Sequence, residues 1–161
     1  DNVVSLQLAL DKGSYPTSAQ RLLGIERMLD RIRQVPGVEM VGAINDVPLG
    51  TGGGIAIAVT PEDVVLEGRI AEPFARYLKA DGGYFRAMGI PLLQGRLMTP
   101  ADDSIAPPVA VIGALMAREI WPNQNPIGKR IQLLDRSGGF RTIVGVVGDV
   151  RERVHLRASR R

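Results

Sequence analysis

Residues 82–103, "GGYFRAMGIPLLQGRLMTPADD", decide how this chain folds. The first eight residues predict a short helix or turn with Tyr84, Phe85 and Met88 on one side. The run "IPLLQGRLM" (90–98) predicts an extended segment, and the Pro and Asp residues after it indicate a surface loop. A short helix followed at once by a strand is typical of an α+β domain.

The segments on either side of this stretch continue a strand-rich pattern. Upstream, strands are predicted at "IAIAV" (55–59), "VVLEGRI" (64–70) and "FARYLKA" (74–80). Downstream, "VAVIG" (109–113) predicts a buried strand and "ALMAREIWP" (114–122) a helix that Pro122 ends. The runs "KRIQLL" (129–134) and "FRTIVGVVGDV" (140–150) predict two strands joined by the hairpin-like "DRSGG" (135–139).

The first fifty residues predict a β-α-β unit. Residues 3–10 alternate like a strand, and "VEMVGAI" (38–44) predicts a second one. Between them, Thr17 and Gln20 form the T-x-x-Q pattern of a capping box at a helix start. Apolar residues then recur at helical spacing, which predicts an amphipathic helix that docks on a sheet. They are Leu22, Ile25, Met28, Leu29 and Ile32.

Composition restricts the possible functions. The 161 residues include no cysteine, which excludes disulfides, thiolate catalysis and cysteine-ligated metals. The net charge is +3, but residues 151–161 alone carry +4, so the basicity belongs to the tail. No apolar run approaches the roughly 18–20 residues that span a bilayer. The abrupt strand-like start predicts an excised domain, and a tail acting on anionic lipid or nucleic acid is a further hypothesis.

The glycine run "LGTGGG" (49–54) looks at first like a phosphate cradle. A phosphate loop needs glycines directly before a helix N-terminus, whereas the β-branched "IAIAV" that follows here favours a strand. We therefore expect an inter-lobe hinge or partner contact at Gly50, Thr51, Gly52, Gly53 and Gly54. A small-molecule or phosphate-binding domain centred on residues 50–54 is the alternative.

No other motif provides a credible catalytic set. In "NPIGKRI", Asn123 stands where the first Walker glycine belongs and Arg130 takes the Ser/Thr position. Asp102 and Asp103 are adjacent and diverge on an extended loop, so a solvated turn is favoured over an acid/base pair. His155 is the only histidine and lies in the basic tail, which argues against a zinc site. We expect no catalytic residue, metal or cofactor, and no nucleic-acid partner.

Three blocks in order are specific to one family. They are residues 82–103, "PPVAVIGALMAREIWPNQNPIGKRIQL" (107–133) and "TIVGVVGDVR" (142–151), supported by "PGVEMVGAINDVPL" (36–49). Together they resemble the extracytoplasmic (periplasmic) core domain of MacB-like, FtsX-related ABC transporter permeases over nearly the whole chain. The residues that carry this structural signature are Tyr84, Phe85, Met88, Gly89, Pro91, Gly95, Arg96, Trp121, Pro122, Pro126 and Gly128.

The resemblance implies an architecture and a function. Residues 1–50 would be the first porter-like β-α-β unit, 55–150 a strand-rich, sabre-like lobe with short helices, and 151–161 a basic tail; the family's second β-α-β unit would lie downstream. The domain would lie outside the cytoplasmic membrane between transmembrane helices of the same permease. A cytoplasmic ABC ATPase would drive it, and a periplasmic adaptor, an outer-membrane channel and a dimeric full-length protein are implied partners. Its function would be non-catalytic coupling, in efflux or mechanotransmission.

Overall fold

The computed structural model describes residues 3–11, 13–45, 55–64, 73–102, 105–133 and 139–149. Within these ranges the chain forms three helices and six strands. They are α1 (Ser18–Arg33), β1 (Ile55–Pro61), β2 (Phe74–Tyr77), α2 (Gly82–Ala87), β3 (Leu92–Gly95), β4 (Val109–Gly113), α3 (Ala114–Ile120), β5 (Arg130–Leu133) and β6 (Phe140–Val147). Mixed helix and strand confirm the predicted α+β class.

All six strands belong to one sheet, in the order β2-β1-β5-β6-β3, with β4 also paired to β6. Every pair is antiparallel except β4 and β6, which are parallel. The eight-residue β6 pairs with β5 through residues 140–142 and with β3 through 145–147. Because β6 contacts three strands, it organises the sheet.

The hydrophobic core lies between this sheet and α3, which packs on β4 and β6. Its largest fully buried side chains are Trp121, Ile143, Val59 and Pro126. Trp121 directly follows the last residue of α3, as "EIWP" predicted, and it is 1% exposed. All members of the core cluster lie between residues 57 and 146. We call the described residues from 55 to 149 the sheet lobe.

Residues 3–45, the N-terminal part, are organised differently. The capping box forms as predicted: Gln20 N donates to Thr17 Oγ1, and Thr17 N donates to Gln20 Oε1. However, residues 3–11 are extended without strand pairing, and residues 38–45 make one isolated bridge, Ile44 to Ala80. The two predicted strands therefore lack a partner strand among the described residues. Gly24, against the Tyr15 ring, is the buried residue of α1.

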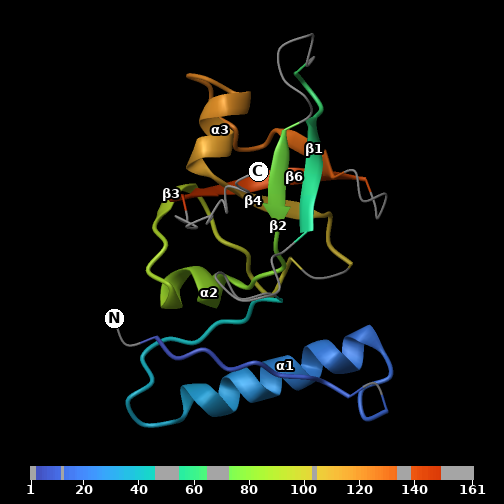
Figure 1. Cartoon of the computed structure of the whole chain (residues 1–161), viewed down its shortest axis with the longest axis vertical. Helices are drawn as coiled ribbons and strands as arrows, with labels where there is room; N and C mark the ends of the chain where they lie inside the picture. The colour runs from blue at the N-terminus through green and yellow to red at the C-terminus, as the bar shows by residue number, and fades with distance from the viewer. Residues whose placement is uncertain are drawn as a thin grey trace, which may run out of the picture.

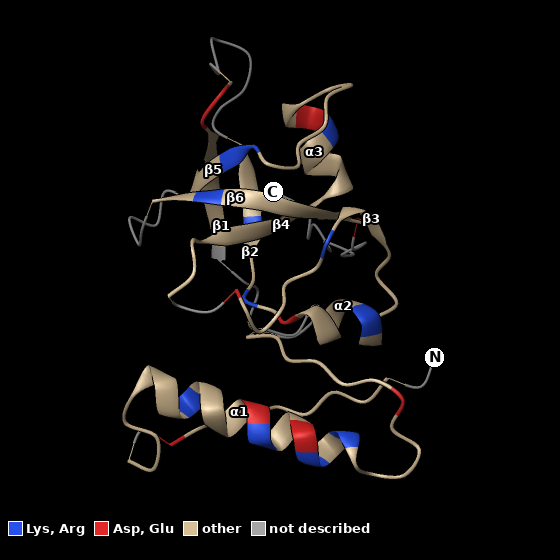
Figure 2. Ribbon diagram, turned by 180° about the vertical axis from the view of Figure 1, so that it is seen from behind, with Lys and Arg blue, Asp and Glu red and all other residues tan. Residues whose placement is uncertain are grey.

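The two parts lie one beyond the other (Figure 1). In that view α3 and the sheet occupy one end and α1 the other, with α2 and the extended segment 38–45 between them. Several charged residues follow one another along α1, whereas most of the sheet consists of uncharged residues (Figure 2). None of the helices in the described ranges is long and apolar enough to cross a membrane.

Candidate functional site

Among the described residues, segments 41–45 and 79–84 connect the N-terminal part to the sheet lobe, and we call these residues the joint. Its backbone contacts are reciprocal: Asp81 N donates to Ala43 O at 3.0 Å and Asn45 N donates to Lys79 O at 2.9 Å. The side chain of Asn45 adds a third bond, since its Oδ1 accepts from Lys79 N at 2.7 Å. A short antiparallel pairing thus connects the two parts.

Asp81 is the residue on which the joint depends most. Its Oδ1 accepts from Tyr84 N at 2.8 Å, which caps the N-terminus of α2. The same oxygen accepts from Ala43 N at 3.1 Å, from the N-terminal part. One carboxylate therefore starts a helix of the sheet lobe and holds a strand-like segment 38 residues away.

Glycines allow the two backbones of the joint to touch. A Cβ on Gly42 would lie 1.9 Å from Tyr84 N, and one on Gly83 would lie 2.4 Å from Val41 O. A Cβ on Gly82 would lie 2.5 Å from Met98 O, on the loop after β3. These distances leave no room for a side chain, which explains why the stretch 82–103 begins with two glycines.

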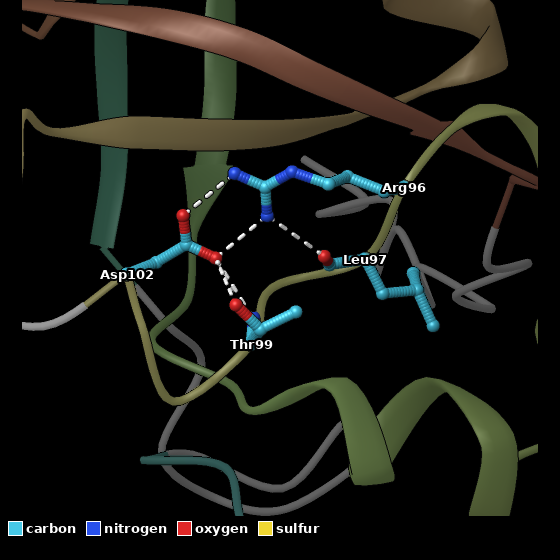
Figure 3. Close-up of polar contacts among 4 residues, drawn as sticks. All are labelled: Arg96, Leu97, Thr99 and Asp102. Carbon is cyan, nitrogen blue, oxygen red and sulfur yellow. Dashed lines mark hydrogen bonds and ion pairs between the residues drawn. The ribbon is translucent and has the colours of Figure 1, made fainter.

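The loop after β3 is held by an ion pair (Figure 3). Arg96 Nη1 and Nη2 each donate to one oxygen of Asp102 at 2.7 Å, and Nη1 also donates to Leu97 O at 3.2 Å. Asp102 Oδ2 further accepts from Thr99 N at 2.8 Å and Thr99 Oγ1 at 3.0 Å. The Arg96 guanidinium holds the pKa of the Asp102 carboxyl far below its usual range.

This arrangement gives Asp102 a structural role. Both oxygens of this carboxylate accept hydrogen bonds that close the loop, and the carboxylate stays ionised, so it does not exchange protons near neutral pH. The predicted solvated turn is therefore a loop closed by its own ion pair, and the Asp102 side chain is only 10% exposed. Asp103 lies outside the described residues.

Asp63, after the end of β1, ties together two residues of the family signature region. Its Oδ1 accepts from Trp121 Nε1 at 2.9 Å, and its Oδ2 accepts from Lys129 Nζ. Lys129 also lies over the Trp121 ring, 5.6 Å from its centroid, and donates to Gln124 Oε1 at 2.8 Å. The hydrogen bond from Lys129 lowers the pKa of the Asp63 carboxyl. The "WPNQNPIGK" run (121–129) is thus closed around one aspartate.

A fourth carboxylate, Asp149, caps α3 from beyond the end of β6. Its Oδ1 accepts from Leu115 N at 2.7 Å, and its Oδ2 accepts from Arg118 Nη2 at 3.2 Å. The N-cap residue of α3, Gly113, provides no side-chain cap of its own. Asp149 therefore supplies, from 34 residues away, the acceptor that the helix start lacks.

The signature residues chosen from the sequence hold the fold in most cases. Tyr84, Trp121 and Pro126 are buried, and Gly89, Gly95 and Gly128 adopt positive φ. Met88, predicted on the same side as Tyr84, is 41% exposed. The candidates Gly50, Thr51, Gly52, Gly53 and Gly54 lie outside the described residues and stay a prediction.

Sequence reasoning missed Asp81, Asp63 and Asp149, the three aspartates that join distant segments. Only Asp81 left a local signal, because an Asp directly before "GGYF" is a favoured helix N-cap. Metal chemistry finds no support in the described ranges, where no three His, Cys, Asp or Glu side chains gather. The site that the geometry offers is therefore a mechanical joint with structural clamps around it.

Comparison with known proteins gives the family. The model of the MacB-like periplasmic core domain matches residues 3–156. The chain belongs to this family. It is accordingly a periplasmic, extracytoplasmic domain of an ABC transporter permease. No curated protein matches the chain.

Three solved structures are similar to this chain. A domain of a protein described as a permease from Porphyromonas gingivalis shares 19% identity with a TM-score of 0.50, covering 76% of this chain and 48% of that one. The extracellular domain of the transporter YknZ from Gram-positive bacteria shares 18% (TM-score 0.48; 77% and 57% covered). The periplasmic region of MacB from Actinobacillus actinomycetemcomitans shares 25% (TM-score 0.41; 58% and 42% covered). The chain thus spans about half the length of these structures.

Proposed function

We propose that this domain is a non-catalytic coupling module of its permease. Transmembrane helices of the same protein, moved by a cytoplasmic ABC ATPase, would displace the domain and so act on a periplasmic substrate or partner. A periplasmic adaptor, an outer-membrane channel and a dimeric full-length permease belong to the same proposal. The single observation that carries it is the family match over residues 3–156.

The aspartates support a mechanical rather than a catalytic role. Asp63, Asp81 and Asp149 each accept hydrogen bonds from backbone amides or cations of distant segments of the chain, and Asp102 accepts them within its own loop. Carboxylates committed in this way resist relative movement of the segments they join. Such clamps suit a body that transmits force as a unit.

We propose residues 55–150 as the sabre-like lobe and residues 1–50, which include the N-terminal part, as the first porter-like β-α-β unit. Large apolar side chains are exposed along it: Val3, Val4, Leu6, Leu8, Leu22, Leu23, Val35 and Met40. Extended backbone without strand pairing next to such side chains is typical of a sheet that lacks its remaining strands. We propose that a second β-α-β unit of the permease completes it, which agrees with the greater length of the similar solved structures.

The proposal is tested on the full-length permease with its ATPase in nanodiscs. Glu119→Cys, at an exposed position on α3, carries a spin label after any cysteine outside residues 1–161 has been replaced by serine. We expect the distance distribution between the two copies to change when ATP and vanadate trap the ATPase. An ATPase variant that cannot bind ATP is the control and should give no change.

Identical distributions with and without trapped nucleotide would contradict coupling through this domain. If no distance between two labels can be measured in either state, the dimer would be contradicted. Coupling would then be tested from the distance between a label at Glu119 and a second label in the membrane helices. Both outcomes leave the family membership intact, because that rests on the sequence match.

A further inference from the structure

We propose that the joint fixes the N-terminal part at a set angle on the sheet lobe, and that the Asp81 carboxylate sets this angle. The inference concerns the chain itself and can be tested without a transporter. Its use in transmitting movement rests on the proposed function.

Among the described residues, the two parts are connected at the joint. The hydrogen bonds that cross from residues 3–45 to residues 55–149 involve Ala43, Asn45, Lys79 and Asp81. Within the described ranges, the hydrophobic core cluster includes no residue of the N-terminal part, and α1 makes no extensive contact with a strand. The orientation of α1 therefore depends on a few polar contacts at the joint.

The contacts at the joint leave no freedom for rotation. Gly42 and Gly83 place backbone against backbone, so no flexible side chain lies between the two surfaces. The reciprocal bonds of the Ile44–Ala80 bridge fix the direction of segment 41–45, and Asp81 adds a third, side-chain bond at Ala43 N. A rotation would break the bridge and the carboxylate bond together.

Asp81 connects the orientation of the N-terminal part to the N-terminus of α2. The same Oδ1 serves both Ala43 N and Tyr84 N, so any displacement of segment 41–45 changes the cap of α2. The next contact is Gly82 on Met98 O, in the loop that Arg96 and Asp102 close. Tight contacts therefore connect segment 41–45, which follows α1, with the loop after β3.

The test is a distance measurement on the 161-residue chain, which has no native cysteine. Spin labels are placed at Glu26→Cys on α1 and Gln94→Cys on β3, both exposed. We expect one narrow distance distribution for the parent protein. Asp81→Ala should at least double its width, whereas Asp81→Asn, which keeps an acceptor oxygen, should leave it narrow.

A matched control is available in the same chain. Asp149→Ala also removes a carboxylate that caps a helix from outside, but that helix, α3, lies within the sheet lobe. It should leave the distribution between residues 26 and 94 narrow. Broadening in Asp149→Ala equal to that in Asp81→Ala would show a general loss of stability and overturn the assignment to Asp81.

Two further results would overturn the proposal. One is a parent distribution as broad as that of Asp81→Ala, and the other is an Asp81→Ala distribution as narrow as the parent's. If Asp81→Ala does not fold, Gly83→Ala replaces it, since its Cβ would meet Val41 O without removing the cap of α2. We expect Gly83→Ala to shift the mean distance, and an unchanged mean would reject a fixed joint. None of these outcomes affects the nanodisc experiment, which would still test the proposed function.

Discussion

The two parts of this domain reach stability by different means. In the sheet lobe, Ile143 and Trp121 are 0% and 1% exposed, and six strands share one sheet. In the N-terminal part, Val4 is 83% exposed and two extended segments lack strand partners. Burial of apolar surface is the main source of folding free energy, so most of the folding free energy that comes from burial lies in the sheet lobe.

This difference has a consequence for a coupling domain. A rigid body that moves needs an internally stable lobe, and it also needs a surface that the rest of the protein can hold. The sheet lobe meets the first need through its core, and the exposed apolar side chains of the N-terminal part suit the second. The joint at Asp81 is what makes the two parts move together.

The largest effect is expected from Trp121→Ala in the sheet lobe. The substitution empties a site that is 1% exposed and removes the bond to Asp63, so we expect a loss of about 3–5 kcal/mol in unfolding free energy. Urea unfolding of the 161-residue chain measures it. Trp121→Phe, which keeps most of the packing and loses only the bond, should cost about 1–2 kcal/mol.

Hydrogen exchange on Trp121→Ala then sharpens the comparison. Amides of β4 and β6 should lose protection, while those in the middle of α1 should exchange as in the parent, because no core contact connects them. Equal loss of protection in α1 and β6 would mean that the two parts unfold as one cooperative unit.

The second effect concerns the end of β3. Gly95 has φ +71°, and a Cβ there would lie 2.1 Å from Val144 O on the paired strand β6. Gly89 has φ +64°, but its Cβ would meet nothing within 4 Å. Gly89→Ala should therefore lower the free energy of unfolding by roughly 1–2 kcal/mol, because alanine disfavours the left-handed conformation. Gly95→Ala should lower it by more, because its Cβ would also clash with Val144 O. Equal costs, measured by urea unfolding, would show that β3 yields without strain.

Much of the sheet lobe was predictable because its determinants are local. A short apolar run predicted β4, two strand-like runs on either side of a hairpin-like turn predicted β5 and β6, and Pro122 marked the end of the helix that Trp121 follows. The start of α1 was predictable for the same reason, since Thr17 and Gln20 contact each other three residues apart. The resemblance in three ordered blocks gave the family before any geometry was known.

The joint was not predictable, because its partners are far apart in sequence. Asp81 and Ala43 are 38 residues apart, and no periodicity links an aspartate to a distant amide. Strand pairing failed for a related reason: alternation in residues 3–10 reports which side chains share a face, and says nothing about whether a partner strand exists.

A smaller effect is expected from Asp102→Asn, and it should depend on pH. The folded pKa of Asp102 is lowered by Arg96, so the ionised carboxylate stabilises the loop fully above the unfolded pKa of about 3.9. This stabilisation is lost as the pH falls from there toward the folded pKa. The difference in urea midpoint between parent and Asp102→Asn should therefore be constant from pH 5 to 7 and shrink below about pH 4. A difference that is the same at pH 3 and pH 7 would contradict the ion pair.

The smallest effect on the whole chain is expected from Thr17→Ala in the N-terminal part. The substitution removes the acceptor for Gln20 N and leaves the first turn of α1 uncapped, which should cost the helix about 1 kcal/mol. Because α1 shares no core with the sheet, the urea midpoint read from Trp121 fluorescence should stay unchanged. Amides in the first turns of α1 should exchange about five-fold faster, the rate change that 1 kcal/mol corresponds to. Thr17→Ser, which keeps the hydroxyl, should restore protection. A lower Trp121 midpoint in Thr17→Ala would show that the joint transmits stability as well as orientation, and the contrast between the two parts would then be one of packing alone.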